Sequence, residues 1–99
     1  MKFRQYEKYA SKSLQKKHTA VFFALGLVGK VGQVCSLIKQ QQEQGSIDLT
    51  EQIQEALGDS LWYLTLLSKK YGGLEEVVGQ NLEKLADCYE EEAGQSKKF

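Results

Sequence analysis

The chain of 99 residues contains no proline, and its nine glycines fall at only a few points. Proline breaks or kinks a helix, and glycine just past the last turn often ends one. A chain without proline and with separated glycines therefore favours long helices joined by short turns. No internal repeat and no linker divides the sequence. We expect residues 1–99 to form one all-α domain of four helices.

Glycines and capping residues predict where these helices begin and end. Thr19 is suited to cap the N-terminus of the second helix, and Gly45 to end it. Asp48 and Glu51 have the spacing of a capping box for the third helix, and Gly72-Gly73 follows its end. The expected helices cover about residues 2–16, 20–43, 48–71 and 74–92, with a frayed tail to Phe99.

Composition excludes several classes of function. The chain has 13 basic and 13 acidic residues, so no net field attracts a nucleic-acid polymer or an anionic membrane. No signal peptide is expected from the N-terminal residues, and the apolar run at residues 20–29 is expected to be too short to span a bilayer. A cytoplasmic protein is expected. Cys35 and Cys88 make no disulfide framework and are expected to be free and buried.

Apolar side chains on two sides of the third helix predict an oligomer. Trp62 points almost opposite to a stripe at helical spacing, and Tyr63 lies between the two. A helix with two apolar sides needs two neighbours, and a second subunit can supply one of them. We therefore expect a homodimer or a higher homo-oligomer. The stripe consists of Ile53, Leu57, Leu61, Leu64 and Leu67.

The N-terminal part of the chain offers further expectations about the core and about a close approach. In the first helix, Tyr6, Tyr9 and Leu14 are expected to touch the core. In the second, Gly26, Gly29 and Gly32 recur three residues apart. Each interior helical glycine costs roughly 1 kcal/mol relative to alanine. Something is therefore expected to approach this backbone closely, and tight helix packing and a ligand site remain equally open interpretations.

Three collinear segments of the chain carry a family resemblance. Residues 24–34 read ALGLVGKVGQV, residues 55–64 read EALGDSLWYL, and residues 81–85 read NLEKL. They resemble, in this order, the patterns A-L-G-L-x-G-E-x-G-E-V, E-E-L-G-D-x-L-W-Y-L and N-x-x-K-L of the MazG-like nucleoside triphosphate pyrophosphohydrolases. The resemblance covers nearly the whole chain and implies a four-helix MazG-like fold that forms an oligomeric helical bundle.

The resemblance also implies a reaction and a metal. Enzymes of this family cleave a nucleoside triphosphate into the monophosphate and pyrophosphate with the help of Mg²⁺. An E-x-x-E pair on the second helix faces an E-x-x-D pair on the third. Magnesium requires such oxygen ligands, and residues three apart share one helix face. Bound Mg²⁺ neutralises phosphate charge and activates the attacking water.

The family-equivalent metal positions of this chain depart from that pattern at three of four places. They are Lys30, Gln33, Ala56 and Asp59, so that only Asp59 supplies the expected acid. A lysine ammonium 4 Å from a cation would repel it by roughly 4 kcal/mol per unit charge at an effective dielectric near 20. Weak or absent Mg²⁺ binding and impaired catalysis are expected.

Two substitutes for the missing ligands remain open. Glu55 precedes Asp59 by four positions and is either a replacement ligand or a solvated surface residue. Lys30 is positioned to pair with Asp59 or with a nucleotide phosphate. The remaining candidate contacts to a nucleoside triphosphate are Lys39, Trp62, Asn81 and Lys84. A structural or regulatory helical oligomer that binds nucleotides without hydrolysing them is the alternative function.

Overall fold

The computed structural model describes residues 2–13 and 18–94, with side chains through residue 90, and within these ranges all regular structure is helical. The elements are α1 (Phe3–Ser11), α2 (Ala20–Gln44), α3 (Thr50–Ser68), the 3-10 helix η1 (Lys69–Tyr71) and α4 (Leu74–Gly94). The predicted all-α class is confirmed.

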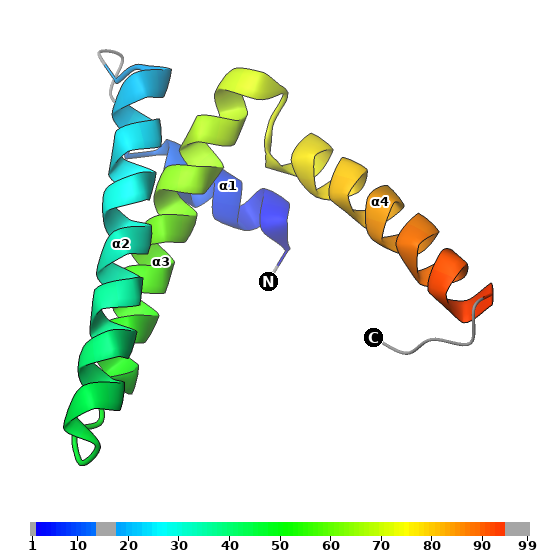
Figure 1. Ribbon diagram of the computed structural model, residues 1–99. Coiled ribbons are helices and arrows are strands. Elements are labelled where there is room, and N and C mark those ends of the chain that lie inside the picture. The colour runs from blue at the N-terminus through cyan, green and yellow to red at the C-terminus, as the bar shows by residue number, and fades with distance from the viewer. Residues whose placement is uncertain (1, 14–17, 95–99) are drawn as a thin grey trace.

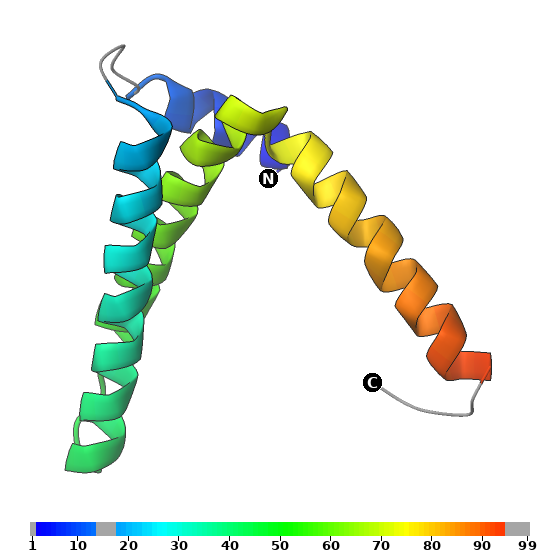
Figure 2. The ribbon, with the colours of Figure 1, turned by 45° about the horizontal axis from the view of Figure 1, so that its top comes forward.

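The helices form an open V rather than a closed bundle within one chain. Helices α2 and α3 lie side by side as an antiparallel hairpin, and α1 lies close to the upper part of α3 (Figure 1). Helix α4 leaves the end of α3 and runs away from the hairpin, as both views show (Figure 2). One limb of the V is therefore the α2–α3 hairpin, and the other limb is α4.

The predicted ends of the second and third helices are confirmed. The Thr19 hydroxyl accepts a hydrogen bond from the Phe22 N–H at 3.3 Å, which satisfies one of the free donors at the start of α2. Gly45 follows α2 with a φ of 63°, and Gly72 follows η1 with a φ of 105°. Glycine adopts these left-handed conformations without the steric cost that a Cβ would bring.

The start of α3 differs in detail from the predicted capping box. The Asp48 carboxylate accepts hydrogen bonds from the Thr50 N–H at 3.0 Å and from the Thr50 hydroxyl at 2.6 Å. These two bonds stabilise the carboxylate and hold the pKa of Asp48 below its usual value. The residue that closes this turn is thus Thr50 rather than Glu51.

Helix α1 is shorter than predicted, and two serines near its end bond back to the backbone. The Ser11 hydroxyl donates to the Glu7 carbonyl at 2.6 Å, and the Ser13 hydroxyl donates to the Ala10 carbonyl at 2.7 Å. Such bonds offer the chain an alternative to continuing the helix. Tyr9, expected in the core, is instead 63% exposed, and Leu14 lies outside the described residues.

The core lies where α1, α2 and α3 meet. Ala10, Phe23 and Leu66 are buried together, and Tyr6 and Trp62 are among the partly buried side chains that pack against them. The Trp62 ring meets the Phe23 ring edge-on at 6.0 Å between centroids, a favourable aromatic geometry. The Trp62 indole N–H also donates to the Ser13 hydroxyl at 2.9 Å. The Trp62 side of α3 is therefore covered within the chain.

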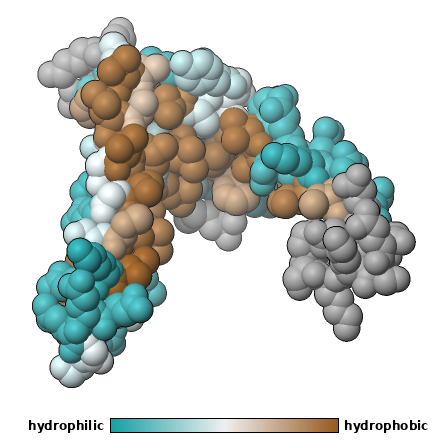
Figure 3. Space-filling view, in the orientation of Figure 1, coloured by the Kyte–Doolittle hydropathy of each residue, from teal (hydrophilic) through white to brown (hydrophobic). Residues whose placement is uncertain are grey.

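The opposite, leucine side of α3 is only partly covered. Leu57, Leu61 and Leu64 of the predicted stripe are exposed, whereas Ile53 is partly buried and Leu67 packs against the core. On α2, the side away from α3 carries Val21 and Leu25 at 66% and 67% exposure. The space-filling view shows apolar surface along the hairpin and over the first part of α4 (Figure 3). The prediction that Cys35 and Cys88 are buried is wrong, since both thiols are exposed on these helices.

Helix α2 is also long and apolar enough, by length and composition alone, to cross a membrane. Its most apolar 18-residue window has a mean hydropathy of 1.8, and 6% of that window is buried within the chain. This window extends past Lys30 and is therefore longer than the uncharged run at residues 20–29. An apolar helix of this composition can also pack against another protein subunit.

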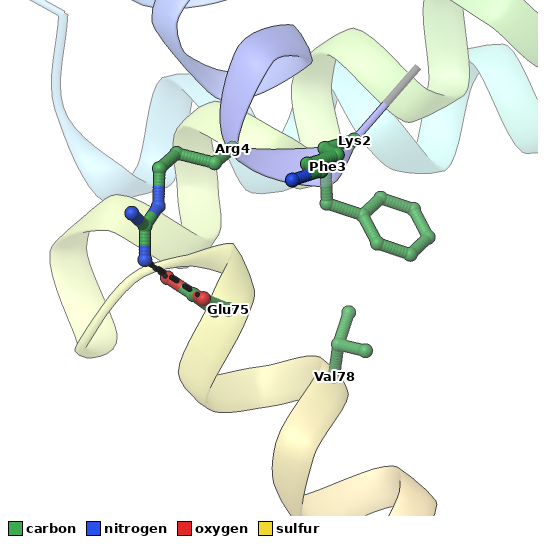
Figure 4. A pocket seen from close by; sticks show the side chains of 5 residues that line it. All are labelled: Lys2, Phe3, Arg4, Glu75 and Val78. Atoms are coloured by element: carbon green, nitrogen blue, oxygen red, sulfur yellow. Dashed lines mark hydrogen bonds and ion pairs between the residues drawn. The ribbon is translucent and has the colours of Figure 1, made fainter.

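Contacts from α1 set the direction of α4. The Glu7 carboxylate accepts the Leu74 N–H at 3.0 Å, so an acidic group from α1 lies at the positive end of the α4 dipole. Arg4 pairs with Glu75 at 3.0 Å, while Phe3 and Val78 form the apolar side of the same pocket of about 310 Å³ (Figure 4). The ion pair is solvated and contributes little, whereas the Glu7 cap anchors the first turn of α4.

Candidate functional site

The side of α2 that packs on α3 is apolar along most of its length, and Lys30 interrupts it. Leu27, Val34 and Leu37 are partly buried on this side at helical spacing, and Lys30 occupies the position between Leu27 and Val34. The lysine side chain consequently projects toward α3 instead of into open solvent. The antiparallel hairpin brings it beside Asp59, which lies near the middle of α3.

Lys30, Gln33 and Asp59 meet at the seam between the two helices. The Lys30 Nζ lies 3.2 Å from Asp59 Oδ2 and donates to Gln33 Oε1 at 3.5 Å. The Lys30 and Asp59 side chains are 33% and 47% exposed, so water still reaches both charges. The structure thus brings together three of the four family-equivalent positions, and a positive charge occupies their centre.

Two aromatic side chains, Trp62 and Tyr63, lie beside this ion pair. Lys30, Asp59, Trp62 and Tyr63 line an open pocket of about 260 Å³. The two rings meet edge-on with centroids 4.9 Å apart, and Tyr63 also contacts the backbone of Gly26. The pocket therefore offers one ammonium, one carboxylate and an apolar surface, which is a combination suited to an anionic ligand that carries a planar ring.

Ala56 and Glu55 supply no ligand to the pocket. Ala56 is 2% exposed and lies buried on α3, three residues before Asp59. Glu55 is exposed, and the described residues that line the pocket do not include it. Within residues 2–13 and 18–90, no group of three or more His, Cys, Asp or Glu side chains could hold a metal ion. Because Lys30 Nζ sits where a cation would need anionic oxygens, the residues present do not fit Mg²⁺.

The other sequence candidates lie elsewhere in the chain. Lys39 is near the far end of α2, where its Nζ pairs with Glu43 at 3.8 Å and both side chains are solvated. Asn81 and Lys84 border a separate groove between α4 and the α1–α3 surface, together with Phe3 and Leu64. Within one chain, Trp62 is thus the only one of the four predicted substrate contacts that lies in the described lining of the Lys30 pocket.

Tyr6 belongs to the surroundings of this site, although the sequence indicated only a core residue. Burial raises the pKa of the Tyr6 phenol, and the negative charge of Asp59 raises it further. Helix α1 thus places an aromatic hydroxyl within electrostatic reach of the Lys30–Asp59 pair. No spacing pattern in the sequence relates Tyr6 to Asp59, because the two lie on helices whose packing is tertiary.

The raised pKa of Tyr6 gives a testable dependence on pH. Unfolding returns the phenol to its ordinary pKa near 10, so the contribution of Tyr6 to stability is present below about pH 10 and is lost as the pH rises further. In an absorbance titration at alkaline pH, we expect the absorbance change lost in Tyr6→Phe to belong to a phenol with a pKa above its ordinary value. Asp59→Asn should lower the pKa of that phenol. A difference between the wild-type and Tyr6→Phe curves that is centred at the ordinary pKa of tyrosine would contradict this assignment.

Comparison with known proteins adds no family to these observations. No protein-family model, no curated protein sequence and no solved structure matches the chain.

Proposed function

We propose that this chain is a MazG-like nucleotide pyrophosphohydrolase homologue with weak or no catalysis, in which an ion pair stands where the family holds Mg²⁺. The observation that carries the proposal is the 3.2 Å contact between Lys30 Nζ and Asp59 Oδ2 at the α2–α3 seam. The segment around Lys30 and the segment around Asp59 are the two whose sequences resemble the family motifs, and they pack against each other in the hairpin.

Nucleoside triphosphate binding is part of this proposal. A lysine ammonium binds phosphate as a point charge and needs no metal to do so. The pocket volume of about 260 Å³ suits part of a nucleotide rather than the whole molecule, with a phosphate at Lys30 and a ring against Trp62 and Tyr63. Without clustered acidic oxygens, the pocket cannot activate water through a metal as the family reaction requires.

Substitutions on the two sides of the ion pair should change triphosphate affinity in opposite directions. We expect Lys30→Ala to weaken binding at least tenfold, because the phosphate loses its cation. Asp59→Asn should strengthen binding several-fold, because the ammonium is no longer neutralised by the carboxylate. Isothermal titration calorimetry with a panel of triphosphates, with and without Mg²⁺, measures both effects.

Lys39→Ala is the matched control for this experiment. It removes the same charge from the same helix, at a site where Lys39 pairs only with Glu43 among the described residues. Its triphosphate affinity should stay within twofold of the wild type. If the wild type binds no triphosphate under either condition, or if Lys30→Ala and Lys39→Ala weaken binding equally, the proposed binding is wrong.

Residual hydrolysis through Asp59, Glu55 and an unusual metal shell is the competing enzymatic function. The exposed position of Glu55 outside the pocket lining does not favour it. Release of pyrophosphate from a triphosphate panel with Mg²⁺ or Mn²⁺ separates the two functions. We expect no release above background, and a rate that Asp59→Asn abolishes would support the enzyme instead.

A structural or regulatory helical oligomer is the second candidate function. The exposed leucines of α3 and the exposed apolar side chains of α2 favour it, since surfaces of this kind commonly mark contacts with other subunits. We place either function in the cytoplasm, with small nucleotides rather than nucleic-acid polymers as ligands. The balanced charge of the chain supports the preference for small nucleotides over nucleic-acid polymers.

A further inference from the structure

The inside of the V is an apolar groove with walls from both limbs. A hollow of about 680 Å³ is bordered by Leu64 of α3, Phe3 of α1 and several side chains of α4, among them Val78 and Leu82. Leu57 and Leu61 continue the α3 wall along the hairpin, and Leu85 continues the α4 wall. The two limbs diverge with distance from the junction of α3 and α4 (Figure 2). The groove is therefore open to an elongated apolar occupant.

The amount of apolar surface in the groove is suited to a stable protein interface. Leu82 and Leu85 are 61% and 51% exposed, and the leucines of the other wall and Phe3 are exposed as well. Together with Val77, these side chains present on the order of 500 Å² of apolar surface per copy, which is about the apolar part of one side of a standard-size interface.

The charges of the chain favour a second copy as the occupant. Helix α4 contains seven acidic residues and one basic residue, whereas residues 2–13 contain four basic residues and one acidic residue. Among the described side chains, Arg4 and Glu75 form the ion pair between these two segments, at the first turn of α4. The rest of α4 extends away from its own α1 (Figure 1). Its acidic end can therefore meet a basic α1 only on another molecule.

The same charges decide the relative direction of the two copies. In a parallel pair of α4 helices, the two acidic C-terminal ends would lie together and repel. In an antiparallel pair, each acidic end lies beside the junction of the other copy, where α1 supplies Lys2, Arg4 and Lys8. The helices that form the two walls of the groove also have similar lengths. The 21 residues of α4 and the 19 of α3 span roughly 31 and 28 Å at 1.5 Å per residue.

We infer that two copies of this chain associate about a two-fold axis, with the α4 of each copy lying antiparallel to the other in the groove of its partner. The paired core consists of α3 and α4 from both copies, which gives the helical bundle that one chain alone does not close. The inference concerns how two copies meet, and it stands whether or not the chain binds nucleotides.

Sedimentation of the full chain tests the association. At tens of micromolar we expect a mass of about 22 kDa, twice the 11.2 kDa of one chain. Leu82→Glu puts a charge into the apolar wall and should weaken the dimer at least tenfold. Gln42→Glu adds the same charge at an exposed residue of α2 outside the groove lining and should leave the dimer within twofold of the wild type. Circular dichroism verifies that both variants keep their helices.

A cross-link tests the antiparallel pairing itself. Leu82 lies near the middle of α4, so the two Leu82 positions are close to the two-fold axis of an antiparallel pair. In a Cys35→Ser, Cys88→Ser background, Leu82→Cys should form a disulfide-linked dimer on mild oxidation, because bridged Cα atoms must lie within about 7 Å. A Gln42→Cys variant in the same background, with its cysteine on α2 outside the groove lining, should not form this cross-link.

Three results would overturn the inference. The first is a monomeric wild type at tens of micromolar. The second is a dimer that Leu82→Glu leaves intact or that Gln42→Glu weakens equally, since another surface, such as the outer side of α2, would then carry it. The third is a folded Leu82→Cys variant that sediments as a dimer without forming the cross-link.

Discussion

Replacing Gly26 with alanine is expected to destabilise the chain by about 1–2 kcal/mol. A Cβ at this position would overlap the ring of Tyr63, in contact with its Cδ1, Cε1 and Cζ atoms. Forcing extra carbon into a packed interface typically costs 1–3 kcal/mol, which outweighs the gain of up to about 1 kcal/mol from replacing a helical glycine. Thermal unfolding at fixed protein concentration measures the change, and a shift of several degrees is expected.

The neighbouring glycine supplies the control. Gly29 lies on the same helix, but a Cβ there would meet nothing within 4 Å. Gly29→Ala should therefore stabilise the chain by about 0.5–1 kcal/mol through helix propensity alone. In a Tyr63→Ala background, Gly26→Ala should lose most of its cost, because its clashing partner is gone. Equal effects of Gly26→Ala and Gly29→Ala would show that no close contact exists.

Restoring acids to α2 should create metal binding where the chain has an ion pair. In Lys30→Glu, Gln33→Glu, two carboxylates on one face of α2 join Asp59 across the seam, since Lys30 Nζ already reaches both of its neighbours. Three carboxylates within reach of one point suit a hard divalent cation. We expect Mn²⁺ affinity to rise at least tenfold over that of the wild type.

The only tryptophan of the chain reports this binding directly. Trp62 lines the pocket, so paramagnetic Mn²⁺ bound there should quench its fluorescence. Lys30→Gln is the control, because it removes the repelling charge and adds no acid. A folded double variant that binds Mn²⁺ no better than Lys30→Gln would contradict this account of the site. Adding Ala56→Glu is the more severe change, since Ala56 is buried and an uncompensated carboxylate there would be costly.

The sequence predicted the helix boundaries best where local chemistry sets them. Thr19 and Gly45 begin and end α2 as expected, because a cap hydrogen bond and a left-handed glycine act within a few residues. The end of α1 was missed, since no glycine or proline marks it and the stop comes from the back-bonding of Ser11 and Ser13. Serine has this capacity in many helices that nevertheless continue.

The site residues, too, were predicted well where spacing along a helix places them and poorly where the packing of distant helices does. The hypothesis that Lys30 pairs with Asp59 agrees with the structure, because both residues belong to helix faces that a hairpin brings together. Asn81 and Lys84 do not join them in one chain, since helical spacing places residues around α4 but does not give the direction in which α4 leaves α3. That direction depends on the hydrogen bond between Glu7 and Leu74, which joins residues 67 positions apart.

This long-range hydrogen bond makes α1 a lever on the rest of the molecule. A helix of nine residues is too short to persist alone in water, yet it orients one of 21 residues. The other support of this orientation is the connection after α3, where Gly72 and Gly73 have φ of 105° and 99° and the Gly73 N–H donates to the Ser68 carbonyl at 2.8 Å. The relative orientation of the two limbs thus rests on the N-terminal helix and on this glycine turn together.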